Sequence, residues 1–227
     1  MPLESSQRSF AEQGAPDPDR RPQPGRDRRS DRSEVQEAGR FRADTYGLLA
    51  RLFRAPPDQP LLDRLAECSD GQGSQSALAA AWAALAEAAR SAEPAALDDE
   101  FHALFIGLGR GEVLPYASWY LSGFLLDKPL AQLRTDLNEL GIERAEDVSE
   151  SEDHFAALCE TMVLLVDPND GIDQAGQKRF FDRHVHSWVP RFLADVRDAQ
   201  SAGFYRRAAD LGREFFAFEE SWLSLPQ

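Results

Sequence analysis

The sequence predicts an all-α fold, a single-domain helical bundle of about eight to ten helices. Apolar residues recur at helical spacing over most of the 227-residue chain, so one face of each segment can be buried. Residues that cap, begin or break helices separate these segments. We find no stretch with convincing strand-like alternation and no internal repeat.

The first 32 residues are predicted to form a disordered N-terminal tail. Residues 1–32 are rich in Pro, Gly, Arg, Asp, Ser and Gln and contain hardly a large apolar residue. Such a segment cannot bury enough surface to offset the entropy lost on ordering. The helical domain is therefore expected over residues 33–227.

Four helices are predicted before the middle of the chain. Ser33 and Gln36 form a capping-box pattern, and the apolar periodicity that follows ends where Pro56 and Pro57 prevent a helix from continuing. Pro60 suits the first turn of the next helix. An alanine-rich run and a further periodic segment follow. The predicted helices cover residues 34–54, 60–68, 75–91 and 94–106.

A glycine-rich break follows the fourth predicted helix. Gly107, Gly109 and Gly111 predict a loop because glycine interrupts helical periodicity. The segment from Glu112 to Gly123 fits either a turn or a buried helix, and we favour a loop followed by a helix.

The remaining helices are predicted from caps and periodicity. Ser149 and Glu152 form a second capping box for a helix that would extend to about Val166. Cys68 and Cys159 both fall within apolar helical patterns, where cysteine behaves as a small buried hydrophobe. Further helices are expected over residues 129–140, 174–188, 190–200 and 203–222.

Charge and hydropathy exclude several classes of protein. The net charge of −14, from 25 basic and 39 acidic residues, argues against a nucleic-acid binder. It suits a basic partner, or it serves only solubility. No apolar run approaches the roughly 20 residues of a membrane helix, and the first residues lack the apolar segment of a secretory signal. We therefore predict a cytoplasmic protein without membrane insertion.

Catalytic and metal-binding patterns are not found. His184 and His186 stand two residues apart, so a helix would point them to different sides, and neither HExxH nor paired CxxC occurs. The segment from Gly107 to Glu112 only superficially resembles a phosphate loop, because Glu112 takes the place of the last glycine and no strand precedes it. We predict no cofactor, no metal and no enzymatic activity.

Two groups of residues are candidates for a binding site. A dense apolar and aromatic cluster flanks the glycine loop and would either fill the core or line a groove for an apolar peptide. Asp153 and His154 fall at a predicted helix start, where an acidic residue can simply stabilise the helix. Alternatively, the Asp153 carboxylate could bind a cation such as an arginine of a guest peptide.

Three segments in fixed order carry a family resemblance. Residues 100–121 follow the pattern E-(F/Y)-x-x-L-F, glycines, P-x-x-S-x-Y, and residues 152–155 follow E-D-H-(L/F). Residues 180–205 follow F-F-x-x-H-(L/V)-x-x-W, then F, then F-Y. Together they resemble the TorD/DmsD/NarJ family of redox-enzyme maturation chaperones, closest to its TorD branch, over about residues 41–222. Ser151 departs from the proline that is common before the second pattern.

The resemblance implies a fold, a function and a site. The fold would be a TorD-like bundle, and the function would be that of a cytoplasmic chaperone. It would bind the twin-arginine leader, the body, or both, of the precursor of a molybdenum-cofactor oxidoreductase catalytic subunit before export, with a formate dehydrogenase as one candidate. The residues implied in peptide binding are Asp153, His154, Pro115, Ser118, Trp119, Tyr120, Phe105 and Leu104.

Two other functions remain open from the sequence. One is a nucleotide-binding enzyme such as a weak GTPase, and the other is a helical adaptor with a partner that is not exported. The sequence does not distinguish a monomer from a homodimer with exchanged helices. It also does not identify the client enzyme, the role of the tail, or whether guanine nucleotide binds.

Overall fold

The computed structural model describes residues 27–68, 76–107, 109–144 and 150–226, with the side chains of the first helix described from residue 35 onward. The described residues are organised into α-helices and two short π-helices, and their β-type pairing consists of one isolated antiparallel bridge between Tyr116 and His154. The predicted all-α fold is therefore confirmed.

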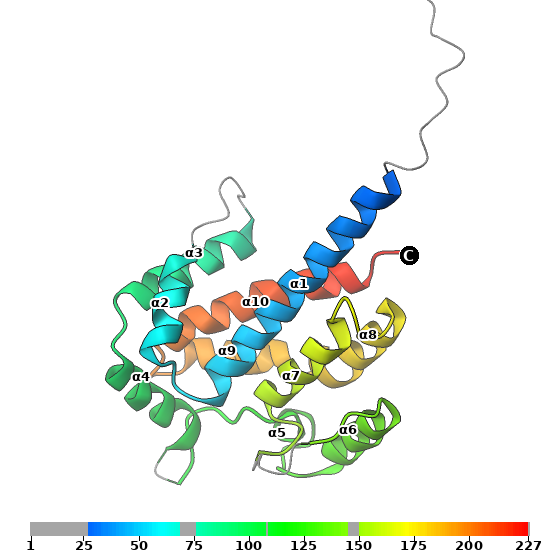
Figure 1. Cartoon of the computed structure of the whole chain (residues 1–227). Coiled ribbons are helices and arrows are strands. Elements are labelled where there is room, and N and C mark those ends of the chain that lie inside the picture. Colours follow the sequence, from blue (N-terminus) through cyan, green and yellow to red (C-terminus); the bar gives the residue numbers. More distant parts are fainter. Residues whose placement is uncertain (1–26, 69–75, 108, 145–149, 227) are drawn as a thin grey trace, which may run out of the picture. The chain divides into compact units, whose positions relative to one another are not determined.

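Figure 1 shows the order of the helices along the chain. The elements before the glycine loop are α1 (Asp27–Arg54), α2 (Gln59–Glu67), α3 (Ala77–Arg90), α4 (Pro94–Phe101) and the π-helix η1 (His102–Ile106). Those after it are α5 (Ala117–Ser122), α6 (Lys128–Glu139), α7 (Phe155–Val166), α8 (Gln174–Phe181), the π-helix η2 (Asp182–His186), α9 (Val189–Asp198) and α10 (Phe204–Leu223).

The chain divides into two units, Met1–Val35 and Gln36–Gln227. The first is described only from Asp27, where α1 begins, seven residues before the predicted start at residue 34. The rest of the predicted tail, residues 1–26, lies outside the described residues. The second unit contains all the other helices.

The core of the second unit surrounds α10. This helix packs against α3 and α9, as Figure 1 shows, while α2 packs against α3. Phe53 of α1 lies in the middle of an aromatic cluster, with ring centroids 4.9 Å from Phe155, 5.5 Å from Phe192 and 5.7 Å from Tyr205. Edge-to-face packing of this kind stabilises a core beyond the burial of apolar area alone.

A buried polar network ties α1 to α8 and α10. Arg42 donates from Nε to Glu219 at 2.5 Å and from Nη2 to Gln177 at 2.9 Å. The Tyr46 hydroxyl donates to Glu219 at 2.9 Å. Burial, with the nearby Glu219 carboxylate, raises the pKa of Tyr46. Every charge in this network has a partner, as a charge in an apolar interior requires.

Several predicted helix boundaries change for local reasons. Asp58 caps α2 and Ser76 caps α3, each accepting a hydrogen bond from the backbone amide three residues on, at 3.0 and 3.1 Å respectively. The predicted helices 94–106 and 174–188 both change from α to π geometry, at His102 and Asp182. A π segment holds one additional residue in the turn, which the apolar spacing does not reveal.

The predicted start of α7 was wrong. Of the predicted capping box, Ser149 lies outside the described residues, and α7 begins at Phe155 rather than near Glu152. The cap is His154, whose Nδ1 accepts a hydrogen bond from the Ala156 amide at 3.0 Å. The prediction for the cysteines was half right, because Cys159 is buried whereas Cys68 is exposed.

Candidate peptide-binding site

Half of the predicted site residues meet where the segment before α5 crosses the segment before α7. The amide of Phe155 donates to the carbonyl of Pro115 at 2.8 Å, and the amide of Ala117 donates to the carbonyl of Asp153 at 2.9 Å. We call the set Pro115, Ser118, Asp153 and His154 the α5–α7 junction. All four side chains are buried, so the junction joins two helix starts within the protein.

Asp153 is the centre of this junction. Its side chain is only 1% exposed, and both carboxylate oxygens accept hydrogen bonds. Oδ2 accepts from the Ser118 amide at 2.9 Å, and Oδ1 accepts from the Ser151 hydroxyl at 2.5 Å. The carboxylate thus satisfies a free amide at the start of α5, and both of its oxygens are bonded within the protein.

His154 is held as a neutral ring. Its Nδ1 accepts the Ala156 amide, so the proton of the neutral ring resides on Nε2. Burial lowers the pKa of His154 to about 4. The ring also meets the ring of Tyr116 edge to face, at 5.0 Å between centroids. Near neutral pH this histidine is therefore an uncharged helix cap.

Ser118 links the junction to the loop after α5. Its hydroxyl oxygen accepts a hydrogen bond from the Leu126 amide at 3.2 Å. Leu126 has a positive φ of 59°, a backbone conformation that is uncommon for a residue with a side chain. The Ser118 hydroxyl therefore helps to hold the loop in a conformation that Leu126 does not favour on its own.

Leu104 and Phe105 belong to the core rather than to an open surface. Leu104 is fully buried. Phe105 packs against Phe101, Phe53 and Tyr205, at centroid distances of 5.1, 5.7 and 5.3 Å. These two predicted site residues support the α4–η1 segment from inside.

Trp119 and Tyr120 are the predicted residues that reach an open cavity. The cavity has a volume of about 240 Å³. We call it the aromatic pocket, and it is lined by Arg110, Glu112, Val113, Leu114, Trp119, Tyr120, Asp195, Asp198 and Ala199. The Tyr120 hydroxyl donates to Asp195 at 2.8 Å, and the Arg110 guanidinium lies 4.5 Å from the Trp119 ring centroid. Burial, together with Asp195, raises the pKa of Tyr120.

Exposed apolar side chains follow the two aromatic residues, from the end of α5 into the next loop, and we call Leu121 and Phe124–Leu126 the apolar loop. Leu121, Phe124, Leu125 and Leu126 are 43%, 71%, 47% and 69% exposed. Four large apolar side chains exposed within six positions form a patch of the kind that marks an interaction surface. This loop was not among the predicted site residues, although the run Phe124–Leu126 between Gly123 and Asp127 is a visible signal for it.

Two acidic residues within the first motif cap distant segments. The Glu100 carboxylate accepts hydrogen bonds from the amides of Gly203 and Tyr205, both at 2.8 Å, at the start of α10. Glu112 accepts from the Gln200 amide at 2.8 Å and from the hydroxyl of Ser201. The hydrogen bond from Ser201 lowers the pKa of Glu112. Both residues serve the fold at helix ends.

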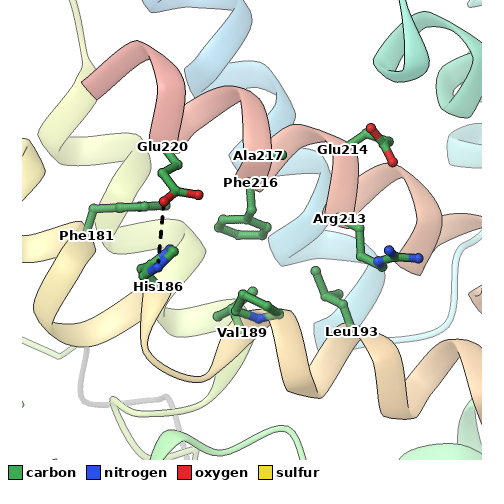
Figure 2. A pocket seen from close by; sticks show the side chains of 10 residues that line it. Phe181, His186, Val189, Leu193, Arg213, Glu214, Phe216, Ala217 and Glu220 are labelled. Carbon is green, nitrogen blue, oxygen red and sulfur yellow. Dashed lines mark ion pairs between the residues drawn. The ribbon is translucent and has the colours of Figure 1, made fainter. Parts of the chain in front are cut away.

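A second cavity lies apart from all of the predicted residues (Figure 2). It has a volume of about 280 Å³ and is lined by residues of α8, η2, α9 and α10. Its apolar side is formed by core side chains that include Phe181, Phe216 and Leu193. His186 and Glu220 face each other across its edge at 3.9 Å. None of the predicted site residues lines this cavity.

The described part of the chain contains neither a candidate metal-binding cluster nor a candidate membrane span. No group of three or more His, Cys, Asp or Glu residues there could hold a metal ion. Among the helices of residues 27–226 that the structure describes, none combines the length and apolar character needed to cross a bilayer.

This chain is similar to one protein family and to several known proteins. Residues 72–194 match the family model described as nitrate reductase delta subunit. A chaperone protein TorD from Vibrio parahaemolyticus is 26% identical over 134 residues, which are 55% of this chain and 62% of that protein. One from Vibrio cholerae is 30% identical over 125 residues, 51% of this chain and 57% of the relative. In these two alignments the chain spans less than two thirds of the relative's length.

Longer matches extend over most of the chain. A chaperone protein TorD from Vibrio atlanticus is 25% identical over 203 residues, 81% of this chain and 94% of the relative. The crystal structure of a protein described as a redox enzyme maturation protein from Archaeoglobus fulgidus has a TM-score of 0.54 and 17% identity. It covers 78% of this chain and 94% of its own, and it supports the fold. The chain belongs to the nitrate reductase delta subunit family, the TorD/DmsD/NarJ family that its three motifs resemble.

Proposed function

We propose that this protein is a cytoplasmic chaperone for the maturation of a redox enzyme. It binds the twin-arginine leader, the body, or both, of the precursor of a molybdenum-cofactor oxidoreductase catalytic subunit before export, and it catalyses no reaction itself. The names of the TorD relatives and of the A. fulgidus protein support this proposal. The acidic charge of the chain, −14, favours a guest with a basic segment.

The observation that carries the proposal is the position of the apolar loop beside the aromatic pocket. Trp119 and Tyr120 lie directly before the exposed side chains of the loop, on the same short stretch of chain. A leader combines basic residues with an apolar segment, and this surface offers carboxylates and apolar side chains close together. Burial of such side chains by a peptide contributes about 25 cal/mol per Å² of apolar area, less the cost of ordering the peptide.

The predicted residues take different roles in this proposal. Trp119 and Tyr120 contact the peptide, together with the apolar loop. Pro115, Ser118, Asp153 and His154 position α5 and α7 so that this surface keeps its shape. Leu104 and Phe105 support it from the core. In this proposal Asp153 positions α5 and α7 instead of contacting a guest arginine, as the sequence had led us to expect, because its side chain is only 1% exposed and bonded to Ser118 and Ser151.

Titration calorimetry with a synthetic twin-arginine leader peptide tests the proposal. We expect Phe124→Ser and Trp119→Ala each to weaken binding about tenfold or more, because each removes a large apolar contact. The matched control is Leu225→Ser, since Leu225 is 56% exposed and lies outside this surface. Unchanged affinity in both test variants would refute the site. Recovery of no leader-bearing redox subunit with the protein from its native cell would count against the function.

A further inference from the structure

Two arginines lie over the aromatic rings of Trp119 and Tyr120, and they are held very differently. The Arg191 guanidinium lies 5.7 Å from the Tyr120 ring centroid, and its Nη1 also donates to the Tyr120 carbonyl at 3.4 Å. Arg110 stacks more closely, at 4.5 Å from the Trp119 centroid. Yet the Arg110 guanidinium has no ion pair or hydrogen bond with any residue in the described part of the chain. Arg110 therefore occupies an aromatic face without being anchored there.

Acidic groups in the same pocket provide acceptors for a cation. Asp195 accepts the Tyr120 hydroxyl, and Glu112 is engaged by Ser201 and Gln200. The carboxylate of Asp198, at the end of α9, has no hydrogen-bond or ion-pair partner among the described residues. Three carboxylates thus line the pocket against the single cation of Arg110. An aromatic face next to a free carboxylate is the combination that binds a guanidinium group well, by stacking and by charge-assisted hydrogen bonds.

The loop that carries Arg110 is fixed at its ends but leaves the side chain free. A Cβ at Gly107 would lie 2.1 Å from the Arg110 carbonyl oxygen, and one at Gly111 would lie 2.5 Å from that of Leu104. Both positions thus require glycine for close backbone packing. The Arg110 side chain itself is exposed, so it can leave Trp119 without disturbing the backbone.

We propose that the aromatic pocket is an arginine-binding subsite in which Arg110 is an internal competitor. An arginine of the guest peptide displaces Arg110 from Trp119 and also pairs with Asp198, which Arg110 leaves without a partner. This inference rests on the proposed function for the identity of the guest. The internal arginine lowers the affinity most for a guest whose own guanidinium group must take the same place on Trp119.

The test uses the full-length protein and two leader peptides, one with adjacent arginines and one with lysines in their place. For the arginine peptide we expect Arg110→Gln to increase affinity about twofold to fivefold, the size of an exposed cation–π contact. The lysine peptide should gain less, because an ammonium group lacks the planar face that stacks. Asp198→Asn should weaken binding of the arginine peptide about threefold to tenfold.

Arg64→Gln is the matched control, since it removes the same charge from an exposed position on α2. The internal competitor would be refuted if Arg64→Gln raised the peptide affinity as much as Arg110→Gln, or if Arg110→Gln raised it equally for both peptides. The loss of one positive charge would then explain the gain. Circular dichroism of each variant verifies that its helical content is unchanged.

A small probe separates failure of this inference from failure of the proposed function. N-acetylarginine amide is titrated into the protein while the indole N–H signal of Trp119 is followed by NMR, with N-acetyllysine amide as reference. A shift that saturates with the arginine compound and grows stronger in Arg110→Gln supports the subsite even if no leader peptide binds. If leader peptides bind but neither this signal nor their affinity responds to Arg110→Gln, the subsite is refuted and the chaperone function stands.

Discussion

The α5–α7 junction and the aromatic pocket lie on neighbouring residues but use their polar groups in opposite ways. In the junction, Asp153 and His154 are buried and bonded to backbone amides of the protein itself. In the pocket, Trp119 and Tyr120 are partly exposed, and Asp198 has no partner among the described residues. One stretch of chain, Pro115 to Tyr120, contributes to both regions.

This contrast separates the residues that build a site from those that touch its ligand. A buried carboxylate with two hydrogen bonds contributes to stability and to geometry, whereas an exposed one without a partner contributes little to either. Variants of the junction should therefore change the free energy of unfolding, and variants of the pocket should change binding. Three substitutions and one pH series test this division, and they follow in order of decreasing effect on stability.

Asp153→Ala should have the largest effect. It removes the acceptor for the Ser118 amide and the Ser151 hydroxyl, and unsatisfied buried donors cost about 1–3 kcal/mol each. We expect the free energy of unfolding to fall by about 3 kcal/mol in urea denaturation. Asp195→Ala, in the aromatic pocket, is the control and should cost less than about 1 kcal/mol. Equal losses of unfolding free energy in the two variants would contradict the distinction between the junction and the aromatic pocket.

His154 should make stability depend on pH. Its pKa is lowered from 6.5 to about 4 in the folded protein, so the unfolded chain binds a proton that the native state does not. Stability is thus complete above pH 6.5 and decreases as the pH falls toward 4, by about 3 kcal/mol at most. His154→Asn keeps a capping acceptor without the titration, so its unfolding free energy should vary less over this window.

The exposed His186 provides the control for this pH series. His186→Asn makes the same chemical change at a side chain that is 44% exposed, so it controls for the substitution itself. Parallel curves for the protein and for His154→Asn would show that the buried imidazole is not the titrating group.

Ser118→Ala should have an intermediate effect. The substitution removes the acceptor that holds the Leu126 amide, and one hydrogen bond contributes about 1 kcal/mol. Hydrogen exchange of the Leu126 amide should become faster, while the amides of α10 keep their protection. Ser221→Ala, which removes a hydroxyl that bonds only to its own helix, is the control. Unchanged exchange at Leu126 would contradict the role given to Ser118.

Tyr120→Phe should have the smallest effect. It removes a hydrogen bond to an exposed carboxylate and should lower the free energy of unfolding by about 0.5 kcal/mol. The comparison is Tyr205→Phe, whose buried hydroxyl donates to the Leu52 carbonyl at 2.9 Å and should contribute about 1–2 kcal/mol. A larger loss in Tyr120→Phe than in Tyr205→Phe would mean that the pocket is part of the stable core.

The sequence predicts the helices well and the site only partly, for physical reasons. Apolar spacing determines which face of a helix can be buried, and the helices predicted over residues 34–54 and up to Val166 do contain buried residues such as Phe53 and Phe155. The start of α7 was missed because Asp153 is used by α5, a tertiary contact that a local capping pattern does not contain. The π geometry of η1 and η2 was missed for a similar reason, since apolar spacing does not record the extra residue.

The aromatic pocket was harder to predict than the α5–α7 junction. Tyr120 and Asp195 are separated by 75 positions, and on its own Asp195 reads as an ordinary residue of the polar face of α9. Only the fold brings these two groups together. Arg110 was noted in the sequence solely as part of a glycine loop, because its stacking partner follows nine residues later, beyond the loop.

The two cysteines differ enough in exposure for the protein to be labelled chemically at one site. Cys68 is exposed at the end of α2, whereas Cys159 is buried and burial raises the pKa of its thiol. Because the thiolate is the reactive species, a maleimide should attach once to the native protein and twice after unfolding, as mass spectrometry can verify. A dye or a surface linker can thus be placed on α2 without any substitution, leaving Trp119 and the apolar loop unmodified for measurements of peptide capture.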